Sequence, residues 1–502
     1  MSKPNLLGAR RITVDVSVQI VARVLNLALG VVVTLLLARG LGTNGFGIWS
    51  TLFAVTQIAN SFGELGLTQI AVSRAAAAPD REAEWVGALL QLRLLLVIPI
   101  TLGSLIAVLL IAPTQQDAVA GALIALVALV GAPAVLSVVF QLRIRNDISM
   151  AIITFNSVFW AVGVVVVSAL AGGIVAYAAA FLLSTVVTMG VNVGLALRFT
   201  HVRLRGVRAL WRPLLRVGVG VGIAGIFVTS YVKLDQILVF EFAGSHQAGL
   251  YGAAYRLLEQ VQFIPISVMT TLFPLIAAAH KAHRRRMESL LQAAGEYLAM
   301  ASLPILAFTI VAAAPIMVLL FGPKFAAAAG ALPILAGAFV SIAFGYLVGN
   351  MVVVLELQRR FAFYAALGLV VNAALNVVLI PRYGFLAAAW VTLLTEVTVM
   401  SLSARSVLGA LHMRPHVGRV ARTAVAATAM GLLTWAARVA GVPLGGLAAI
   451  ALVSYVPCLL VLRVVSVAEV RSVLRREPPA GAVEAPVSAA VGGAAPSDRS
   501  LP

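Results

Sequence analysis

The stretch Gly42-Thr-Asn-Gly-Phe-Gly47-Ile-Trp49 occurs a second time in this sequence, as Gly244-Ser-His-Gln-Ala-Gly249-Leu-Tyr251. The two copies share the spacing of their glycines, and each lies between two apolar segments. Residues 173–185 and 384–396 form a second related pair at a similar separation along the chain. The chain therefore consists of two related halves. In membrane proteins, such repeats are typical of transporters that bind their substrate between the halves.

The composition indicates a membrane protein built from helices. Hydrophobic residues make up 61% of the sequence and charged residues 11%, and the mean hydropathy is +1.04. Apolar runs of about 20 residues, the length that spans a bilayer, recur throughout. We predict an all-α polytopic membrane protein with about fourteen transmembrane helices, near residues 14–37, 48–72, 86–111, 118–140, 151–171, 174–197, 214–240, 248–278, 297–321, 328–355, 361–380, 384–404, 419–437 and 443–462.

The formal net charge is +18, and the basic residues responsible for it lie almost entirely in every second loop, such as residues 198–216 and 281–286. The opposite side has only Arg39, Lys324, Arg382 and Arg438. Basic residues collect in cytoplasmic loops of membrane proteins, so both termini are expected in the cytoplasm, which requires an even number of spans. Because this rule accounts for the positive charge, we expect no nucleic-acid partner.

The repeats and the charge pattern together predict the domain organisation. Residues 1–212 and 213–412 are expected to form two parallel six-helix lobes around a central polar cavity, related by an axis along the membrane normal. Residues 413–465 would add two further transmembrane helices. Residues 466–502 are rich in Ala, Gly, Ser and Pro and lack an amphipathic period, so we predict a largely disordered cytoplasmic tail.

The sequence contains no motif for covalent chemistry. Cys458 is the only cysteine, which excludes an intramolecular disulfide and Cys/His metal clusters. A P-loop and a His-Glu-x-x-His motif are lacking, and the predicted outer loops are too short to hold an active site. We therefore expect a protein that is not an enzyme, with no catalytic residues, no metal and no cofactor.

Polar residues recur every three or four positions in the first two predicted helices, and again in the corresponding helices of the second half. This spacing places them on one face of each helix. Each ionised side chain costs about 2.5 to 3.5 kcal/mol at the centre of a bilayer. A water-filled cavity and a set of buried ion pairs would both account for them. The residues concerned are Gln19, Arg23, Asn26, Gln57, Asn60, Glu64, Lys233, Asp235, Arg256, Glu259 and Gln262, with Glu396 as a further anion.

Other polar residues have simpler interpretations. Asp15, Arg93 and Glu356 lie near predicted helix ends, where long side chains reach the headgroups. Asn372 and Asn376 lie one turn apart, a pattern typical of hydrogen bonds between membrane helices.

Several of these segments together resemble a known family. Ala38-Arg-Gly-Leu-Gly42 through Trp49, followed by Phe62-Gly-Glu64-Leu-Gly66, is similar to the start of the Wzx-type polysaccharide flippases of the MOP exporter superfamily. Asp235-Gln-Ile-Leu, followed by residues 249–256, is similar to the corresponding part of their second half. The resemblance covers about residues 12 to 465.

The resemblance implies an alternating-access flippase of the bacterial cytoplasmic (inner) membrane. Its substrate would be an undecaprenyl-pyrophosphate-linked oligosaccharide for cell-surface polysaccharide biosynthesis. The implied partners are this substrate, membrane lipids, and a polysaccharide polymerase with its assembly machinery.

The residue types suit that substrate. Arg23, Lys233 and Arg256 would bind the pyrophosphate. Sugar hydroxyls would face Gln19, Asn26, Gln57, Asn60 and Gln262. Glu64, Asp235, Glu259 and Glu396 would neutralise the cations between cycles or carry coupling protons.

Four alternatives remain. A lipid II flippase of the same superfamily would also need a cationic cavity. A drug/cation antiporter of the same fold would be expected to have an acidic one. A membrane glycan polymerase or ligase would need a large outer loop, and a structural scaffold would not explain the polar faces of the helices.

Overall fold

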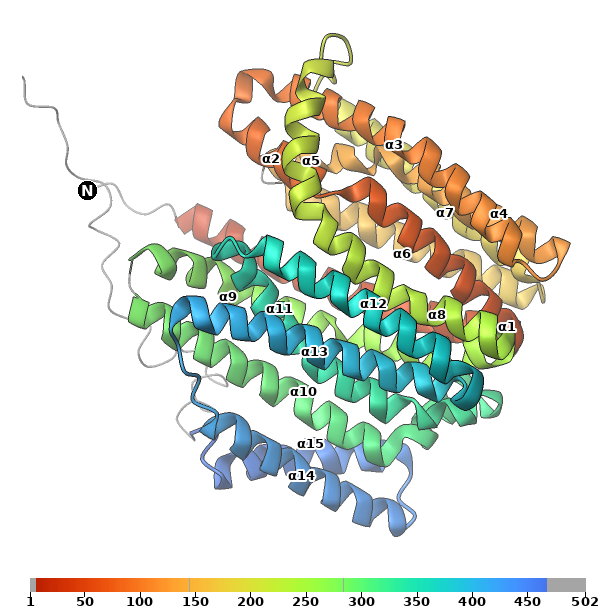
Figure 1. Ribbon diagram of the computed structural model, residues 1–502, viewed down its shortest axis with the longest axis vertical. Helices are drawn as coiled ribbons and strands as arrows, with labels where there is room; N and C mark the ends of the chain where they lie inside the picture. Colours follow the sequence, from red (N-terminus) through yellow and green to blue (C-terminus); the bar gives the residue numbers. More distant parts are fainter. Residues whose placement is uncertain (1–5, 144, 283, 467–502) are drawn as a thin grey trace, which may run out of the picture. The chain divides into compact units, whose positions relative to one another are not determined.

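The computed structural model describes residues 6–143, 145–282 and 284–466, and every regular element in these ranges is helical (Figure 1). The described residues form two compact units, which are divided between His416 and Val417. Within the described part of the second unit, α14 (Gly418–Val439) and α15 (Leu444–Val461) pack against each other. Most of the predicted tail, from residue 467 onward, lies outside the described residues.

The described residues of the first unit form thirteen α-helices. Its first half comprises α1 (Leu6–Glu64), α2 (Leu67–Ala77), α3 (Glu82–Ile111), α4 (Gln115–Gly131), α5 (Val138–Leu142), α6 (Asn146–Ala169) and α7 (Ile174–Phe199). The second half comprises α8 (Trp211–Val261), α9 (Phe263–Ala282), α10 (Arg284–Phe321), α11 (Leu332–Val354), α12 (Gln358–Tyr383) and α13 (Phe385–Leu411).

Twelve helical segments in the described ranges are long and apolar enough to cross a membrane. Two of them, residues 25–77 and 222–280, contain 53 and 59 residues. Since a crossing needs about 20 residues, each of these two is long enough for two crossings. The prediction of a polytopic all-α membrane protein is therefore confirmed, and about fourteen crossings fit these segments.

The predicted helix ends around the repeated turn differ from the observed ones. The sequence predicted loops at 38–47 and 241–247, but α1 and α8 continue through them with a single non-helical residue each, Gly42 and Gly244. The interruption in the first half comes later, where Leu65 and Gly66 both have positive φ between α1 and α2. The predicted turn between two helices is therefore confirmed, but it is a sharp kink at one glycine and not a loop of several residues.

The two kinks have the same backbone conformation. Gly42 has φ 66° and ψ −177°, and Gly244 has φ 84° and ψ 170°. A side chain strongly disfavours this region, which glycine adopts freely. The sequence repeat is therefore also a structural repeat.

The kinked segments meet where α1 and α8 pack together, the most extensive contact between any two helices. A Cβ atom added to Gly47 would lie 1.9 Å from the Ser245 carbonyl oxygen, and one added to Gly249 would lie 1.9 Å from the Thr43 carbonyl oxygen. The Thr43 Oγ1 and His246 Nδ1 atoms are hydrogen-bonded at 2.9 Å. We call this reciprocal backbone contact the glycine seam.

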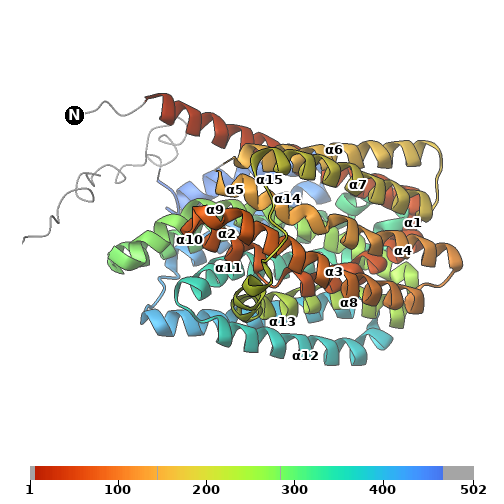
Figure 2. The same ribbon diagram turned by 90° about the horizontal axis from the view of Figure 1, so that it is seen from above.

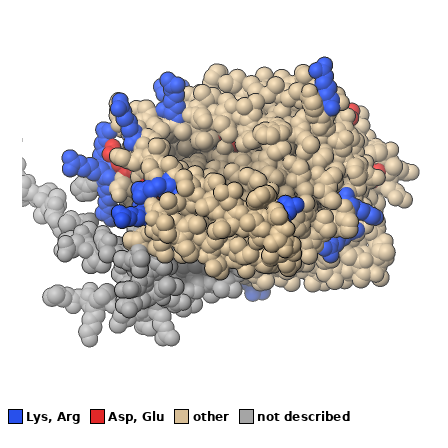
Figure 3. Space-filling view, turned by 90° about the horizontal axis from the view of Figure 1, so that it is seen from below, with Lys and Arg blue, Asp and Glu red and all other residues tan. Residues whose placement is uncertain are grey.

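The remaining helices of the first unit flank this central pair. Helices α3, α4, α6 and α7 pack on α1, whereas α9, α11, α12 and α13 pack on α8 (Figures 1 and 2). The first part of α8 also contacts α2 and α3. Large apolar side chains such as Leu110 and Leu170 are exposed, as expected for surfaces in contact with lipid. On the face shown in Figure 3, Lys and Arg lie toward both ends, with more of them at one end, and much of the surface between carries no charged side chain.

Candidate binding cavity

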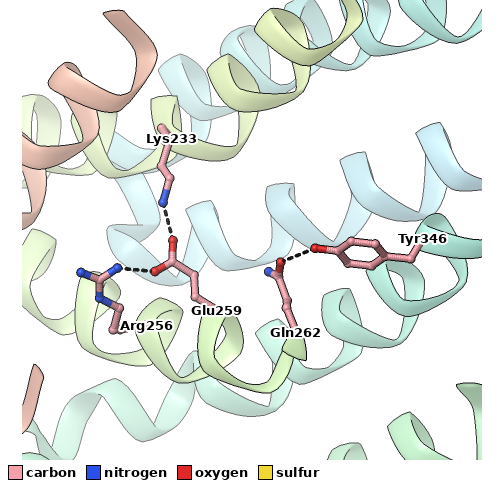
Figure 4. Close-up of polar contacts among 5 residues, drawn as sticks. All are labelled: Lys233, Arg256, Glu259, Gln262 and Tyr346. Carbon is pink, nitrogen blue, oxygen red and sulfur yellow. Dashed lines mark hydrogen bonds and ion pairs between the residues drawn. The ribbon is translucent and has the colours of Figure 1, made fainter. Parts of the chain in front are cut away.

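The kink in α8 brings two distant parts of this helix together. Lys233 and Glu259 are 26 residues apart, a separation of about 39 Å in a straight helix. After the kink at Gly244, the Lys233 ammonium forms an ion pair with the Glu259 carboxylate (Figure 4). Arg256 donates to the other oxygen of the same carboxylate at 2.7 Å. We call Lys233, Arg256 and Glu259 the cation cluster.

The cation cluster has two positive charges and one negative charge in a largely apolar setting. The Lys233, Glu259 and Arg256 side chains are 13%, 22% and 31% exposed. The Arg256 guanidinium lies 5.6 Å from the ring centre of Phe53 on α1, a cation–π contact between the two halves. The net positive charge of this cluster favours an anionic ligand.

A small cavity of about 40 Å³ adjoins the cation cluster. Both halves contribute to its lining, with Trp49, Ser50 and Gln57 from α1 and the cation cluster and Gln236 from α8. A volume of this size holds only a few waters. The halves are therefore closely packed around the cations in this conformation.

A larger cavity of about 470 Å³ lies beside the small one and extends among α8, α11 and α13. Gln57, Lys233 and Tyr255 line both cavities. Gln262, at the junction of α8 and α9, accepts a hydrogen bond from the Tyr346 hydroxyl of α11 at 3.1 Å and contributes to the wall (Figure 4). The cation cluster therefore lies where the two cavities meet.

The larger cavity also contains residues that the sequence analysis missed. Tyr346 and Asn350 lie one turn apart on α11, and Asn350 Nδ2 donates to the Tyr346 carbonyl at 2.7 Å. Two polar residues one turn apart within an apolar span could have indicated a polar wall. They were missed because neither is charged. Glu396, a predicted site residue that is 8% exposed, lines the same cavity and interacts with Tyr231.

Asp235 lies in a different environment from the cation cluster. It is fully buried and accepts hydrogen bonds from Asn376 at 2.7 Å and from Tyr251 at 3.2 Å. Thr392 of α13 also bonds to this carboxylate. Asp235 therefore connects α8 to α12 and α13 and is not among the residues that line either cavity. Asn372 bonds to Asn376 at 3.1 Å in the same network.

The predicted residues of the first half are more scattered. Arg23 is partly exposed and has no ion pair within the described residues. Asn26 Nδ2 donates to the Ala22 carbonyl at 2.8 Å and to Thr154 Oγ1 of α6 at 2.9 Å. Glu64 is exposed, and Asn60 is partly exposed.

The structure thus brings together part of the predicted set. Those lining the cavities are Gln57, Lys233, Arg256, Glu259, Gln262 and Glu396. Those not among the lining residues are Arg23, Asn26, Asn60, Glu64 and Asp235. The Gln19 side chain lies outside the described residues.

Comparison with known proteins places the chain in a family. The family described as polysaccharide biosynthesis protein matches residues 12–280. The probable flippase AglR of Haloferax volcanii is 25% identical over 208 residues, 41% of this chain. The matched region spans 44% of that relative's length.

Solved structures show the same fold. The lipid II flippase MurJ in its inward closed conformation has a TM-score of 0.67 at 12% identity, over 91% of this chain and 98% of that one. An inward-facing MATE-family multidrug transporter of the MOP superfamily has a TM-score of 0.60 at 16% identity, over 78% and 96%. A MOP-superfamily transporter from Pyrococcus furiosus has a TM-score of 0.58 at 17% identity, over 79% and 95%. Since the family match spans more than half of the sequence, this chain belongs to the polysaccharide biosynthesis protein family, with the fold of the MOP-superfamily transporters.

Proposed function

We propose that this protein is a flippase that moves undecaprenyl-pyrophosphate-linked oligosaccharides across the bacterial inner membrane by alternating access. The observation that supports this most is the cation cluster, where Lys233 and Arg256 share one carboxylate between two halves of a membrane transporter fold. A pyrophosphate carries several negative charges, and Lys and Arg side chains are its natural ligands. The polyprenyl chain can remain in lipid while the polar part enters the cavity.

Glu259 has a specific role in this proposal. Its carboxylate neutralises Lys233 and Arg256 while no substrate is bound. An incoming pyrophosphate replaces this carboxylate as the partner of both cations, so no unpaired cation is left in the membrane at either stage. Charge exchange of this kind avoids the cost of about 2.5 to 3.5 kcal/mol for each isolated cation. The displaced Glu259 carboxylate must then take up a proton or be hydrated by water in the cavity.

The other predicted residues have supporting roles. Arg23 is proposed as a third pyrophosphate ligand, and Gln57 and Gln262 as sugar ligands. Gln19, Asn26 and Asn60 on the polar faces of α1 are proposed to meet the sugars at another stage of the cycle. Glu64, Asp235 and Glu396 are proposed to balance charge or to carry coupling protons.

Both termini are proposed to lie in the cytoplasm, as the distribution of basic loops predicts. With no nucleotide-binding motif in the sequence, the energy would come from an ion gradient or from consumption of the product. A polymerase and its assembly machinery on the outer side would consume the translocated units.

The cation cluster also bears on two alternatives. A drug/cation antiporter would repel its substrate from a cluster with two cations and one anion. A lipid II flippase would use the same chemistry, because its substrate is also a polyprenyl pyrophosphate. Complementation of cells depleted of their peptidoglycan flippase separates this second alternative from the proposed function.

Deletion of the gene tests the proposal directly. The expected result is a lipid-linked oligosaccharide that accumulates on the cytoplasmic side of the membrane and disappears when the wild-type gene is restored. A deletion strain with normal surface glycan and no accumulated lipid-linked intermediate would exclude the flippase function.

A further inference from the structure

Gly345 and Gly349 lie one turn apart on α11, where each leaves open space. In membrane helices, small residues four apart usually let another helix approach closely. Gly218 and Gly222 of α8 do this, since added Cβ atoms would lie 2.9 Å and 2.3 Å from the backbone of Leu65. At Gly345 and Gly349, by contrast, an added Cβ atom would meet no heavy atom within 4 Å. Helix packing therefore does not explain this second pair.

The space beside these glycines is the larger cavity of about 470 Å³. Gly345 and Gly349 both line it, and larger side chains at these positions would reduce its volume. Most of its wall is apolar or aromatic, with rings from Tyr231, Tyr255 and Phe361. A few polar groups in a largely apolar wall are typical of sites for small organic ligands.

Three polar groups in this wall have unused hydrogen-bonding capacity. Ser403 is 2% exposed, and its Oγ atom has no hydrogen-bond partner among the described residues. Gln262 uses its Oε1 atom to bind Tyr346, which leaves its amide hydrogens free to donate. Asn350 donates from Nδ2 to a carbonyl, which leaves its Oδ1 atom free to accept.

These groups distinguish between possible occupants. A sugar hydroxyl both donates and accepts, so a sugar can satisfy all three groups, while the apolar faces of its ring pack on the aromatic side chains. A polyprenyl chain offers no hydrogen bonds and would leave the three groups unsatisfied.

We propose that the larger cavity binds the sugars next to the pyrophosphate of the lipid-linked oligosaccharide, with Tyr346, Asn350 and Ser403 as sugar ligands. This proposal rests on the proposed function, which assigns the pyrophosphate to the cation cluster. Lys233 belongs to the cation cluster and also lines the larger cavity, so a pyrophosphate held there has its first sugar at the cavity entrance.

This assignment is tested by measuring the binding of two lipid ligands to the purified protein in lipid nanodiscs. Native mass spectrometry is used to measure the bound fraction. The two ligands are bare undecaprenyl pyrophosphate and the lipid-linked glycan that accumulates in cells lacking the protein. The central variant is Gly349→Leu, whose side chain would occupy part of the cavity beside Asn350. Its matched control is Gly190→Leu on α7, where the glycine is exposed and an added Cβ atom would also meet no heavy atom within 4 Å.

Wild-type protein is expected to bind the glycan-bearing lipid about tenfold more tightly than the bare lipid, a preference of the size that a few hydrogen bonds provide. Gly349→Leu is expected to abolish this preference and to leave bare-lipid affinity within about twofold of wild type. Gly190→Leu is expected to change neither affinity.

Ser403→Ala provides a second variant that removes an unsatisfied hydroxyl and therefore leaves folding unharmed. It is expected to reduce the preference for the glycan-bearing lipid severalfold, whether or not Gly349→Leu folds.

Three outcomes would overturn the assignment. If both Gly349→Leu and Ser403→Ala kept the full preference, the sugars would bind elsewhere. If Gly349→Leu weakened bare-lipid binding as strongly, the cavity would hold the polyprenyl chain. If no lipid-linked glycan accumulated in deleted cells, the proposed function itself would fail, and the sugar site would fail with it.

Discussion

The two halves of the chain carry the same polar pattern, but their charged side chains have different environments. In the second half, Lys233 and Arg256 share the Glu259 carboxylate. In the first half, Arg23 has no ion pair among the described residues, and Glu64 is exposed. The second half thus has a compact cluster of three charges, whereas in the first half Glu64 interacts electrostatically with Arg93 of α3. The comparison therefore locates the compact charged cluster in the second half.

Removing the Glu259 charge should have the largest effect on stability. Glu259→Gln leaves two partly buried cations without a counter-charge, so we expect a loss of about 3 kcal/mol in the substrate-free protein. The same variant should bind undecaprenyl pyrophosphate more tightly, because the competing carboxylate is gone. Thermal unfolding and ligand binding in nanodiscs measure the two effects. Glu64→Gln is the comparison variant from the first half, where loss of the interaction between the exposed Glu64 and Arg93 is expected to cost at most about 1 kcal/mol.

Removing one cation tests the difference between the halves in ligand binding. Arg256→Gln should weaken binding of undecaprenyl pyrophosphate by about 2 kcal/mol, or roughly 30-fold, through loss of a charge-assisted hydrogen bond. Arg23→Gln should have a smaller effect in this conformation, since no contact among the described residues joins Arg23 to the cation cluster. Surface-glycan export at matched protein levels gives a second readout. Normal export by both variants would remove the pyrophosphate role of these arginines.

At the glycine seam the two halves are alike, so matching substitutions should have matching effects. Gly47→Ala and Gly249→Ala each place a methyl group 1.9 Å from a carbonyl oxygen of the other half, and we expect each to cost about 2 kcal/mol. Gly190→Ala on α7 is the control, where replacing an exposed helical glycine should raise stability by about 0.5 to 1 kcal/mol. Thermal unfolding in detergent compares the three. Unchanged stability of either seam variant would show that the halves are not in close contact there.

The smallest expected difference between the halves concerns the stability lost when an asparagine that bonds to another helix is removed. Asn376→Ala removes a donor from the fully buried Asp235 carboxylate, with an expected cost of about 1.5 kcal/mol, near the upper end for membrane hydrogen bonds. Asn26→Ala removes a bond to Thr154, and the average of about 0.6 kcal/mol is expected there. Thermal unfolding of both variants tests whether Asn376→Ala loses more stability than Asn26→Ala. Equal losses would mean that the charge of Asp235 adds nothing to the bond.

Much of the fold could be predicted from the sequence, because the length of the apolar segments directly reflects the thickness of the bilayer. The roles of individual polar residues were harder to predict. Lys233 and Asp235 are two positions apart, which places them about 200° apart around a helix. They therefore face different surroundings, with Lys233 at the cavities and Asp235 in a buried network. Which face meets which neighbour depends on packing between helices, and helical spacing does not contain that information.

The kinks and the uncharged cavity residues are two further features that were not fully predicted from the sequence. Glycine-rich segments at 42–49 and 244–251 suggested loops, but a single glycine reverses each helix while its neighbours stay helical. Tyr346 and Asn350 were missed because their polarity is weak beside that of charged residues. The open space at Gly349 depends on the positions of three other helices, so no local pattern predicts it.

The reciprocal contact at the glycine seam also bears on the origin of the molecule. In an isologous dimer interface, both subunits use the same surface. If one residue of the first subunit contacts a second residue of the partner, the same two residues also meet with the subunits exchanged. Gly47 against Ser245 and Gly249 against Thr43 have this relation, because Thr43 and Ser245 are equivalent positions in the repeat. The seam thus has the form of a two-fold homodimer interface within a single chain. An ancestral half-length protein would have paired with itself through this same glycine before gene fusion joined the two copies.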